Sequence, residues 1–140
     1  DKLLPYASKR NISIKLLNID DDLLLCLGDE ARIKQVLINL ISNAINHSYD
    51  YGNIIINIYR QNDKIYICIR DFGEGISEQD IPFIWDRFYT TNKAKMESGI
   101  GLGLAIVKNI VNAHGADVTV NSIVGEGTEF CFYLTAYNEI

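Results

Sequence analysis

The spacing of apolar and polar residues predicts strands in the first part of the chain, followed by a long helix. Residues 11–17 alternate apolar and polar side chains, and residues 23–27 form a short apolar run, so we expect two strands that pair with each other. From Asp29 to about His47, apolar residues recur at intervals of three and four, which is the spacing of one helix face. Asp29 is a suitable N-cap for this helix.

The rest of the pattern predicts two hairpins and a second helix. Two alternating runs, residues 54–60 and 64–70, are separated by three polar residues and predict a hairpin. Helical spacing returns over residues 101–113. Residues 118–120 and 130–134 lie on either side of a glycine-rich turn and predict a final hairpin.

A polar stretch separates the first hairpin from the second helix. Residues 71–75 contain two glycines, a short helical piece is expected around residues 78–88, and residues 90–98 show no apolar period, so we interpret them as a mobile loop. Hairpins mixed with two long helices indicate an α+β sandwich, with a sheet covered on one face, rather than alternating βαβ units.

Composition narrows the class of protein. The 140 residues suit a single domain, of which 48% are apolar and 22% charged, as in ordinary globular proteins. The net charge of -5 argues against a general nucleic-acid binder, and no apolar run is long enough to cross a membrane. Cys26, Cys68 and Cys131 show no metal-ligand spacing, so we expect buried reduced thiols in a cytosolic protein. The chain begins at Asp1 and looks like a fragment of a longer protein.

Polar side chains follow one side of the first predicted helix. Gln35, Asn39 and Asn43 are spaced four residues apart and form a row, with Asn46 and His47 one turn further on. The solvated back of a helix is normally built from Lys and Glu rather than from asparagines. An amide oxygen is suited to Mg²⁺ that also binds substrate phosphates, so Asn43 is the metal candidate.

A carboxylate and two glycines follow the strand predicted over residues 64–70. Asp71 can accept a hydrogen bond from an exocyclic amine, while Gly73 and Gly75 allow a flat ring or the backbone to approach closely. An ordinary turn is the alternative interpretation. The Asp-Phe-Gly letters do not indicate a eukaryotic-type protein kinase, because the chain lacks the other kinase signatures and is too short for that fold.

A glycine-rich run, residues 99–104, opens the second predicted helix. Free N–H groups at a helix start can hold phosphate oxygens, although the run could also be only a flexible lead-in to the helix. It is neither a dinucleotide fingerprint nor a phosphate loop of the GxxxxGK[ST] type. Arg87, Lys93 and Lys95 are the nearby cations that could reach a γ-phosphate, and for each lysine a solvated loop charge is the alternative.

Taken together and in this order, these motifs resemble the catalytic domain of sensor histidine kinases. That family shares a superfamily with gyrase, the heat-shock chaperone ATPases and the mismatch-repair ATPases. The resemblance spans nearly the whole chain. It is carried by an N box at residues 32–44, a first glycine box at 71–76, an F box at 83–89, a second glycine box at 99–104 and the stretch 125–130 before the last strand.

The resemblance implies a Bergerat-type fold, in which a mixed sheet of about five strands is covered on one face by three helices. ATP would lie between the helix layer and a flexible lid at residues 86–98. Asp71 would bind the adenine amino group, with support from Thr128, and Asn43 would bind Mg²⁺. The other implied nucleotide-binding residues are Asn39, Asn46, His47, Gly73, Gly75, Ile76, Arg87, Phe88, Lys93, Gly99, Ile100, Gly101, Leu102, Gly103 and Leu104.

The implied reaction is transfer of the γ-phosphoryl group of ATP to a histidine, with Asn39, Asn43 and Arg87 as catalytic residues. ATPases of the superfamily carry Glu at the position of Asn39 to activate water, and an amide has no such basicity, so we expect slow hydrolysis. The family often has Lys at the position of Asn46, which leaves a phosphate contact there open.

The acceptor histidine is implied to lie outside this chain. The family places it on an upstream dimerisation segment, so neither His47 nor His114 is the expected acceptor, and residues 1–10 would be the tail of the connecting linker. The expected partners are ATP, that segment of the same parent protein and a response regulator, with no nucleic acid and no membrane contact by this domain. We expect a cytoplasmic domain of a membrane-anchored parent.

Three alternatives remain open. A serine kinase of a regulator protein shares the fold and lacks the upstream histidine segment. A motor or chaperone ATPase is disfavoured because position 39 is not Glu. A nucleotide-binding module kept only for protein docking is disfavoured because Asp71, Asn43 and the glycines are all present.

Overall fold

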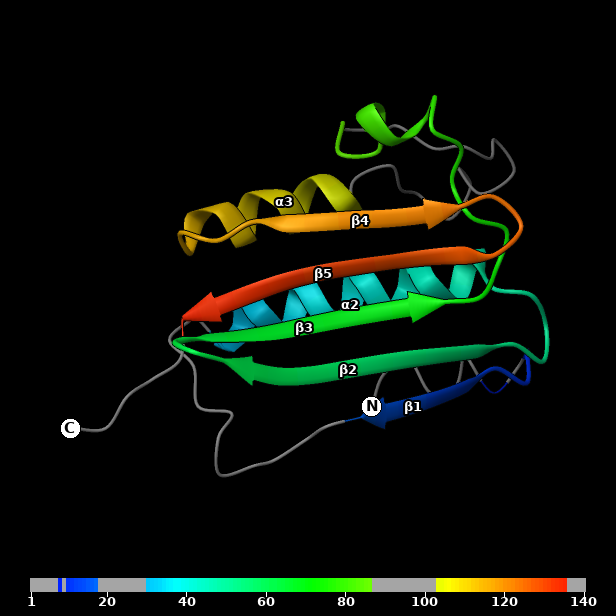
Figure 1. Cartoon of the computed structure of the whole chain (residues 1–140), viewed down its shortest axis with the longest axis horizontal. Helices are drawn as coiled ribbons and strands as arrows, with labels where there is room; N and C mark the ends of the chain where they lie inside the picture. The colour runs from blue at the N-terminus through cyan, green and yellow to red at the C-terminus, as the bar shows by residue number, and fades with distance from the viewer. Residues whose placement is uncertain (1–7, 9, 18–29, 87–102, 136–140) are drawn as a thin grey trace.

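The chain folds into a mixed five-stranded sheet in a computed structural model that describes residues 8, 10–17, 30–86 and 103–135. The sheet order is β1-β2-β3-β5-β4, where β1 is parallel to β2 and the other neighbours are antiparallel. Figure 1 shows the strands side by side in this order. Their bounds are Ser13–Leu17 (β1), Asn53–Gln61 (β2), Lys64–Asp71 (β3), Val118–Ile123 (β4) and Gly127–Thr135 (β5).

Two α-helices, α2 (Glu30–His47) and α3 (Gly103–Ala113), lie on the same face of the sheet (Figure 1). Val36 and Leu40 of α2 and Val107 of α3 are completely buried, in one cluster with Ile69 of β3 and Phe130 of β5. Burial of each large apolar side chain stabilises the fold by about 1.5–3 kcal/mol. The three-and-four spacing in the sequence therefore produces the helix face that covers the sheet.

The structure confirms the predicted α+β sandwich and both hairpins. The β2–β3 turn contains Asn62 at a φ of 58°, a left-handed conformation that Asn tolerates better than most residues. In the described part of the helical piece expected around residues 78–88, up to residue 86, the structure has one short 3-10 helix, η2 (Ile81–Phe83). The strand at residues 11–17 pairs in parallel with β2, while its expected partner at residues 23–27 lies outside the described residues.

Arg10 ties the first strand to the end of α2. Its guanidinium donates hydrogen bonds to the carbonyl oxygens of Ile45 and Ser48, and its Nε lies 2.8 Å from Oδ1 of Asp50. A cation at this place interacts favourably with the negative end of the helix dipole and with the last carbonyls of the helix. The expected linker tail at residues 1–10 is described only at residues 8 and 10, and Arg10 packs on the domain itself.

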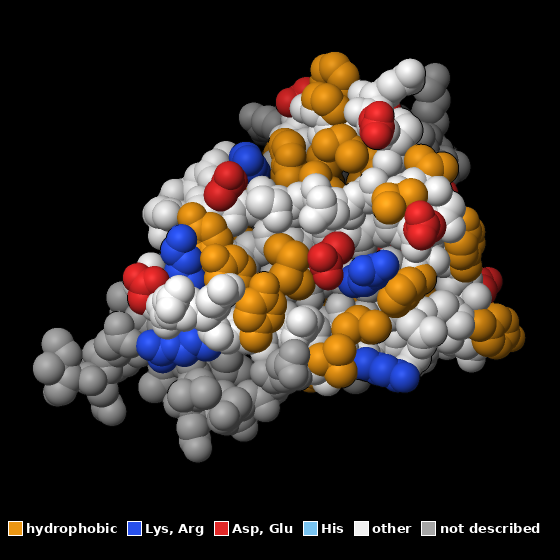
Figure 2. Space-filling model, viewed as in Figure 1, with side chains coloured by type: hydrophobic (Ala, Val, Ile, Leu, Met, Phe, Trp, Pro, Cys, Tyr) orange, Lys and Arg blue, Asp and Glu red, His pale blue; other side chains and the backbone are white. Residues whose placement is uncertain are grey.

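No described helix covers the second face of the sheet, which we call the open face. Figure 2 views the molecule from this side and shows apolar, charged and other polar side chains intermixed. Here Tyr66 of β3 stacks on Tyr59 of β2, with 5.3 Å between the ring centroids.

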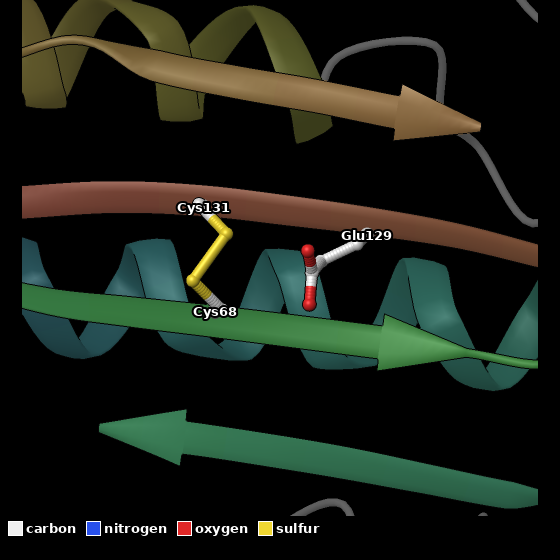
Figure 3. Close-up of side chains that lie close together, drawn as sticks. All are labelled: Cys68, Glu129 and Cys131. Atoms are coloured by element: carbon white, nitrogen blue, oxygen red, sulfur yellow. A yellow bond between two sulfur atoms is a disulfide. The ribbon is translucent and has the colours of Figure 1, made fainter. Parts of the chain in front are cut away.

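The expectation of reduced thiols was wrong for two cysteines on this face. Cys68 of β3 and Cys131 of β5 are directly opposite each other and form a disulfide (Figure 3). They are 63 residues apart in the sequence, so only the strand pairing reveals their proximity. Cys26 lies outside the described residues.

Candidate functional site

The predicted chemistry gathers at one end of the sandwich, where α2 and β3 end and the β4–β5 turn lies (Figure 1). The loop after β3 connects these elements through its backbone. The N–H of Glu74 donates to the carbonyl oxygen of His47 at 3.2 Å, and the N–H of Gly125 donates to that of Glu74 at 2.9 Å. The end of α2 and the β4–β5 turn are therefore held against the same loop.

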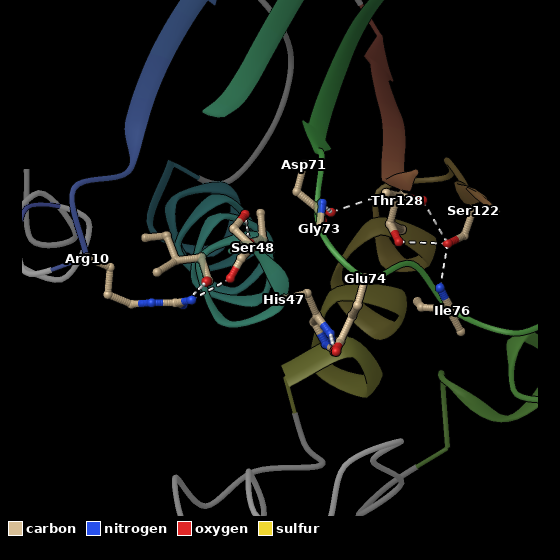
Figure 4. A network of polar contacts seen from close by, with 12 residues as sticks. Arg10, His47, Ser48, Asp71, Gly73, Glu74, Ile76, Ser122 and Thr128 are labelled. Carbon is tan, nitrogen blue, oxygen red and sulfur yellow. Dashed lines mark hydrogen bonds and ion pairs between the residues drawn. The ribbon is translucent and has the colours of Figure 1, made fainter. Parts of the chain in front are cut away.

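Asp71, the last residue of β3, is the buried carboxylate of this site. It is only 1% exposed, and its Oδ1 accepts hydrogen bonds from the N–H groups of Gly73 at 3.0 Å and Thr128 at 3.2 Å (Figure 4). Burial raises the pKa of Asp71 above its usual range, while those two N–H groups and the nearby His47 oppose the rise. The side chain is thus held in one orientation at the end of the strand.

A hydroxyl network in the β4–β5 hairpin includes Thr128, the residue whose N–H binds Asp71. Ser122 accepts a hydrogen bond from the N–H of Ile76 at 2.7 Å and donates to the carbonyl oxygen of Gly127 at 3.0 Å. Because its one hydroxyl hydrogen is used there, the buried Thr128 hydroxyl donates to Ser122 Oγ at 2.7 Å. Sequence reasoning found Thr128 but missed Ser122, because nothing in the local pattern marks Ser122.

The glycines after Asp71 are needed for close backbone approach. A Cβ at Gly73 would lie 1.8 Å from the carbonyl oxygen of His47. At Gly75, where φ is +77°, a Cβ would lie 2.4 Å from the carbonyl oxygen of Ile123. A side chain would therefore push the loop away from α2 or from the hairpin.

The polar row of α2 divides into two groups. Near the start of α3, Asn39 Nδ2 donates to the carbonyl oxygen of Gly103 at 3.4 Å, which connects the two helices. Asn43 is half-buried and Asn46 is exposed. At the end of α2, His47 Nδ1 lies 2.9 Å from Oε1 of Glu74, a residue that sequence reasoning did not select (Figure 4).

The structure therefore brings part of the predicted set together. Five predicted residues belong to one network of polar contacts with Ser122 and Glu74, namely His47, Asp71, Gly73, Ile76 and Thr128. Gly103 and Leu104 lie in the first turn of α3. The expected lid lies outside the described part of the chain except for Asp86. The remaining predicted residues also lie outside it, and these are Arg87, Phe88, Lys93, Gly99, Ile100, Gly101 and Leu102.

The donors and acceptors present fit a purine nucleotide. Both of the hydrogen bonds to Asp71 from described residues end on Oδ1, so Oδ2 remains to accept a bond from an exocyclic amine. Among the described His, Cys, Asp and Glu side chains, the one cluster close enough to hold a metal ion is Cys68, Glu129 and Cys131 on the open face, and its two cysteines are joined in a disulfide rather than free as thiolates. A hard cation beside Asn43 would therefore take most of its oxygen ligands from phosphates and water.

Comparisons with known proteins agree with this geometry. The family model for histidine kinase-, DNA gyrase B- and HSP90-like ATPases matches residues 28–138. Sensor histidine kinase WalK of Bacillus subtilis (strain 168) is 42% identical over 110 residues, which are 76% of this chain and 18% of WalK.

Two solved structures are similar in fold. Full-length ShkA in complex with AMPPNP is 28% identical and matches with a TM-score of 0.82 over 98% of this chain and 29% of that chain. Histidine kinase ThkA in complex with response regulator protein TrrA is 28% identical, with a TM-score of 0.79 over 97% of this chain and 37% of that chain. The chain thus spans less than two fifths of the length of each of these three relatives.

Proposed function

The chain belongs to the histidine kinase-, DNA gyrase B- and HSP90-like ATPase family, and we propose that it is the ATP-binding catalytic domain of a sensor histidine kinase. The buried carboxylate of Asp71 carries this proposal. It is held at the end of β3 by two N–H groups that both bind Oδ1, so that Oδ2 can accept a hydrogen bond from the amino group of adenine. ShkA, which has the same fold, is described with AMPPNP bound.

In this proposal the adenine and phosphate ends of ATP are bound by different elements. Thr128 binds Asp71 through its N–H and Ser122 through its hydroxyl, while Gly73 and Gly75 let the loop after β3 pack against α2 and the β4–β5 hairpin. The phosphates lie toward the start of α3, whose first N–H groups have no partners within the helix. The other residues proposed for the ribose, phosphate and lid contacts are Asn39, Asn46, His47, Gly75, Ile76, Arg87, Phe88, Lys93, Gly99, Ile100, Gly101, Leu102, Gly103 and Leu104.

The donor set indicates phosphoryl transfer rather than rapid hydrolysis. Mg²⁺, held by Asn43 and the phosphates, would neutralise charge on the transferring phosphoryl group. Asn39 is an amide that donates to Gly103 and cannot accept a proton from water, so no described side chain at this position acts as a general base. The protein side chains mainly position ATP for attack by a nucleophile from elsewhere.

That nucleophile is proposed to be a histidine on an upstream dimerisation segment of the parent protein. The phosphoryl group would then pass to a response regulator, the class of partner that ThkA binds in its complex with TrrA. We place this domain in the cytoplasm, in a parent anchored in the membrane. No helix in the described ranges is long and apolar enough to cross a membrane.

Calorimetric titration of ATP into the chain, with and without Mg²⁺, tests the proposal. Wild type should bind ATP with help from Mg²⁺, Asp71→Ala should not bind, and neither should form phosphohistidine alone. Adding a phosphoacceptor segment should restore phosphorylation. Absence of ATP binding by the folded wild type would remove the kinase proposal, and stable phosphohistidine on the chain alone would contradict the separate acceptor.

A further inference from the structure

The disulfide between Cys68 and Cys131 is independent of the nucleotide site and has no role in the proposed reaction. We propose that these two cysteines form a reversible thiol–disulfide pair, which opens and closes by exchange with a small-molecule disulfide such as oxidised glutathione. The pair links the two strands that carry Asp71 and Thr128, each three residues away along its strand.

The strand register brings the two thiols together whenever the sheet is folded. Cys68 and Cys131 are directly opposite in the antiparallel β3–β5 pair, with 4.1 Å between their Cα atoms. Such a short separation is typical of non-hydrogen-bonded pairs, whose side chains approach most closely. The crosslink therefore forms without rearranging the strands.

Other contacts hold the two crosslinked strands together. Strands β3 and β5 remain paired from Lys64 opposite Thr135 to Asp71 opposite Thr128. On the helix side of the same strands, Ile69 and Phe130 are almost completely buried. The reduced protein should thus keep its structure, which makes both redox states accessible to the native chain.

The two sulfurs differ in how easily they can be reached. Cys68 is 6% exposed, whereas Cys131 is half-buried on the open face, where its Sγ also lies within 4.8 Å of a carboxylate oxygen of Glu129 (Figure 3). Thiol–disulfide exchange requires direct approach of a thiolate to a sulfur. Cys131 is therefore the thiol that reacts first, and Cys68 is the resolving thiol.

The exchange proceeds in two balanced steps. The Cys131 thiolate attacks one sulfur of the small disulfide, so that a mixed disulfide forms and one small thiolate leaves. The Cys68 thiolate then attacks Sγ of Cys131 and releases the second small thiolate. The two protein thiols lose two electrons, the small disulfide gains them, and the two thiol protons pass to solvent or to the leaving thiolates. Reduction follows the same steps in reverse.

Alkylation in mixtures of reduced and oxidised glutathione tests this proposal on the native chain. Peptide mapping by mass spectrometry reads Cys68, Cys131 and Cys26 separately. We expect the Cys68 and Cys131 thiols to disappear together as oxidised glutathione increases and to return in reduced glutathione. The oxidised form should melt roughly 10 °C higher, because the crosslink closes a long loop.

Single substitutions test the order of reaction. Cys68→Ser should accumulate a stable mixed disulfide on Cys131, whereas Cys131→Ser should leave Cys68 modified at least tenfold more slowly. Circular dichroism of both variants checks that they fold. Faster modification of Cys68 than of Cys131 would overturn the assigned roles.

Three outcomes of the glutathione titration would overturn the proposal itself. The thiols could persist in excess oxidised glutathione, or the disulfide could persist in excess reduced glutathione as a permanent structural bond. The reduced pair could instead hold Zn²⁺ with Glu129 and resist oxidation, in which case it is a metal site. None of these results depends on nucleotide binding, so the proposed function stands or falls separately.

Discussion

Replacement of Asp71 by Asn separates the structural role of this side chain from its proposed role in adenine binding. The amide of Asp71→Asn keeps an oxygen where Oδ1 accepts the N–H groups of Gly73 and Thr128. It places an NH₂ group where Oδ2 would face the adenine amine. A donor then meets a donor, so the fold should be retained while nucleotide binding is weakened.

Hydrogen-bond energies give the expected size of each effect. A hydrogen bond to a charged group contributes about 1.5–3 kcal/mol, so the Asn variant should bind ATP roughly 10- to 150-fold more weakly. Asp71→Ala also leaves two N–H groups without their acceptor, and each buried unsatisfied group costs about 1–3 kcal/mol. The Ala variant should therefore lose about 2–6 kcal/mol of stability, which the Asn variant keeps.

The pKa of Asp71 predicts how the stability difference between wild type and Asp71→Asn depends on pH. Burial raises the folded-state pKa above the ordinary value of 3.8. Protonation of Asp71 therefore favours the fold; this contribution is complete below the unfolded-state pKa and is lost as the pH rises through the folded-state pKa. The Asn variant cannot ionise, so its free energy of unfolding relative to wild type should increase from about pH 4 upward.

Calorimetric titration measures the ATP affinity, and urea denaturation at a series of pH values measures the free energy of unfolding. Asp117→Asn is the matched control, because Asp117 is an exposed carboxylate that pairs with Lys108 and lies outside the proposed site. The hydrogen bond from Lys108 lowers the pKa of Asp117. The small contribution of ionised Asp117 to stability should therefore be lost as the pH falls, which is the opposite of the pH dependence expected for Asp71. Unchanged ATP affinity in Asp71→Asn would refute adenine recognition by Asp71, and loss of folding like that of Asp71→Ala would refute the acceptor geometry.

Three further substitutions test the contacts around the site. Gly73→Ala should lower the free energy of unfolding by about 2–5 kcal/mol, because its Cβ would meet the carbonyl oxygen of His47. The control Gly103→Ala has open space around it and should be neutral or stabilising by up to about 1 kcal/mol. Thermal unfolding measures both variants. Arg10→Ala should lower the free energy of unfolding measured by urea denaturation by about 1–3 kcal/mol, since the carbonyls at the end of α2 lose a charged donor. An equal decrease in the control Lys34→Ala, which replaces an exposed lysine, would contradict this cause. Ser122→Ala should lower the free energy of unfolding by about 1–3 kcal/mol, because the N–H of Ile76 loses its acceptor. If Ser122→Ala is no more destabilising than Thr119→Ala on the exposed side of β4, the hydroxyl network does not contribute to stability.

Features that depend on short stretches of sequence were predicted well. The apolar spacing around Val36 and Leu40 predicted α2 and its end at His47, because the helix period is set by neighbouring residues, while the expected N-cap Asp29 lies outside the described residues. The alternation on either side of Asn62 predicted the β2–β3 hairpin for the same reason. Asp71 was selected because a carboxylate at a strand end can accept a hydrogen bond from an exocyclic amine, and because the order of the motifs resembles that of the sensor histidine kinases; the local pattern alone also fits an ordinary turn.

Contacts between distant residues were not predictable from these patterns. Arg10 binds residues more than thirty positions away, and Ser122 supports Ile76 from 46 positions away. The pairing of Cys68 with Cys131 depends on the relative register of two strands, which is set by the packed core and not by either strand alone.

The sequence by itself determined the elements, the face that each element buries, and the identity of the side chains that we propose to bind a nucleotide. The tertiary structure decided which of those side chains meet, that Asp71 has an elevated pKa, and that Cys68 and Cys131 are joined. The physical reason is that secondary-structure periods arise from local backbone geometry, whereas burial, hydrogen-bond partners and register arise only when separate elements pack together.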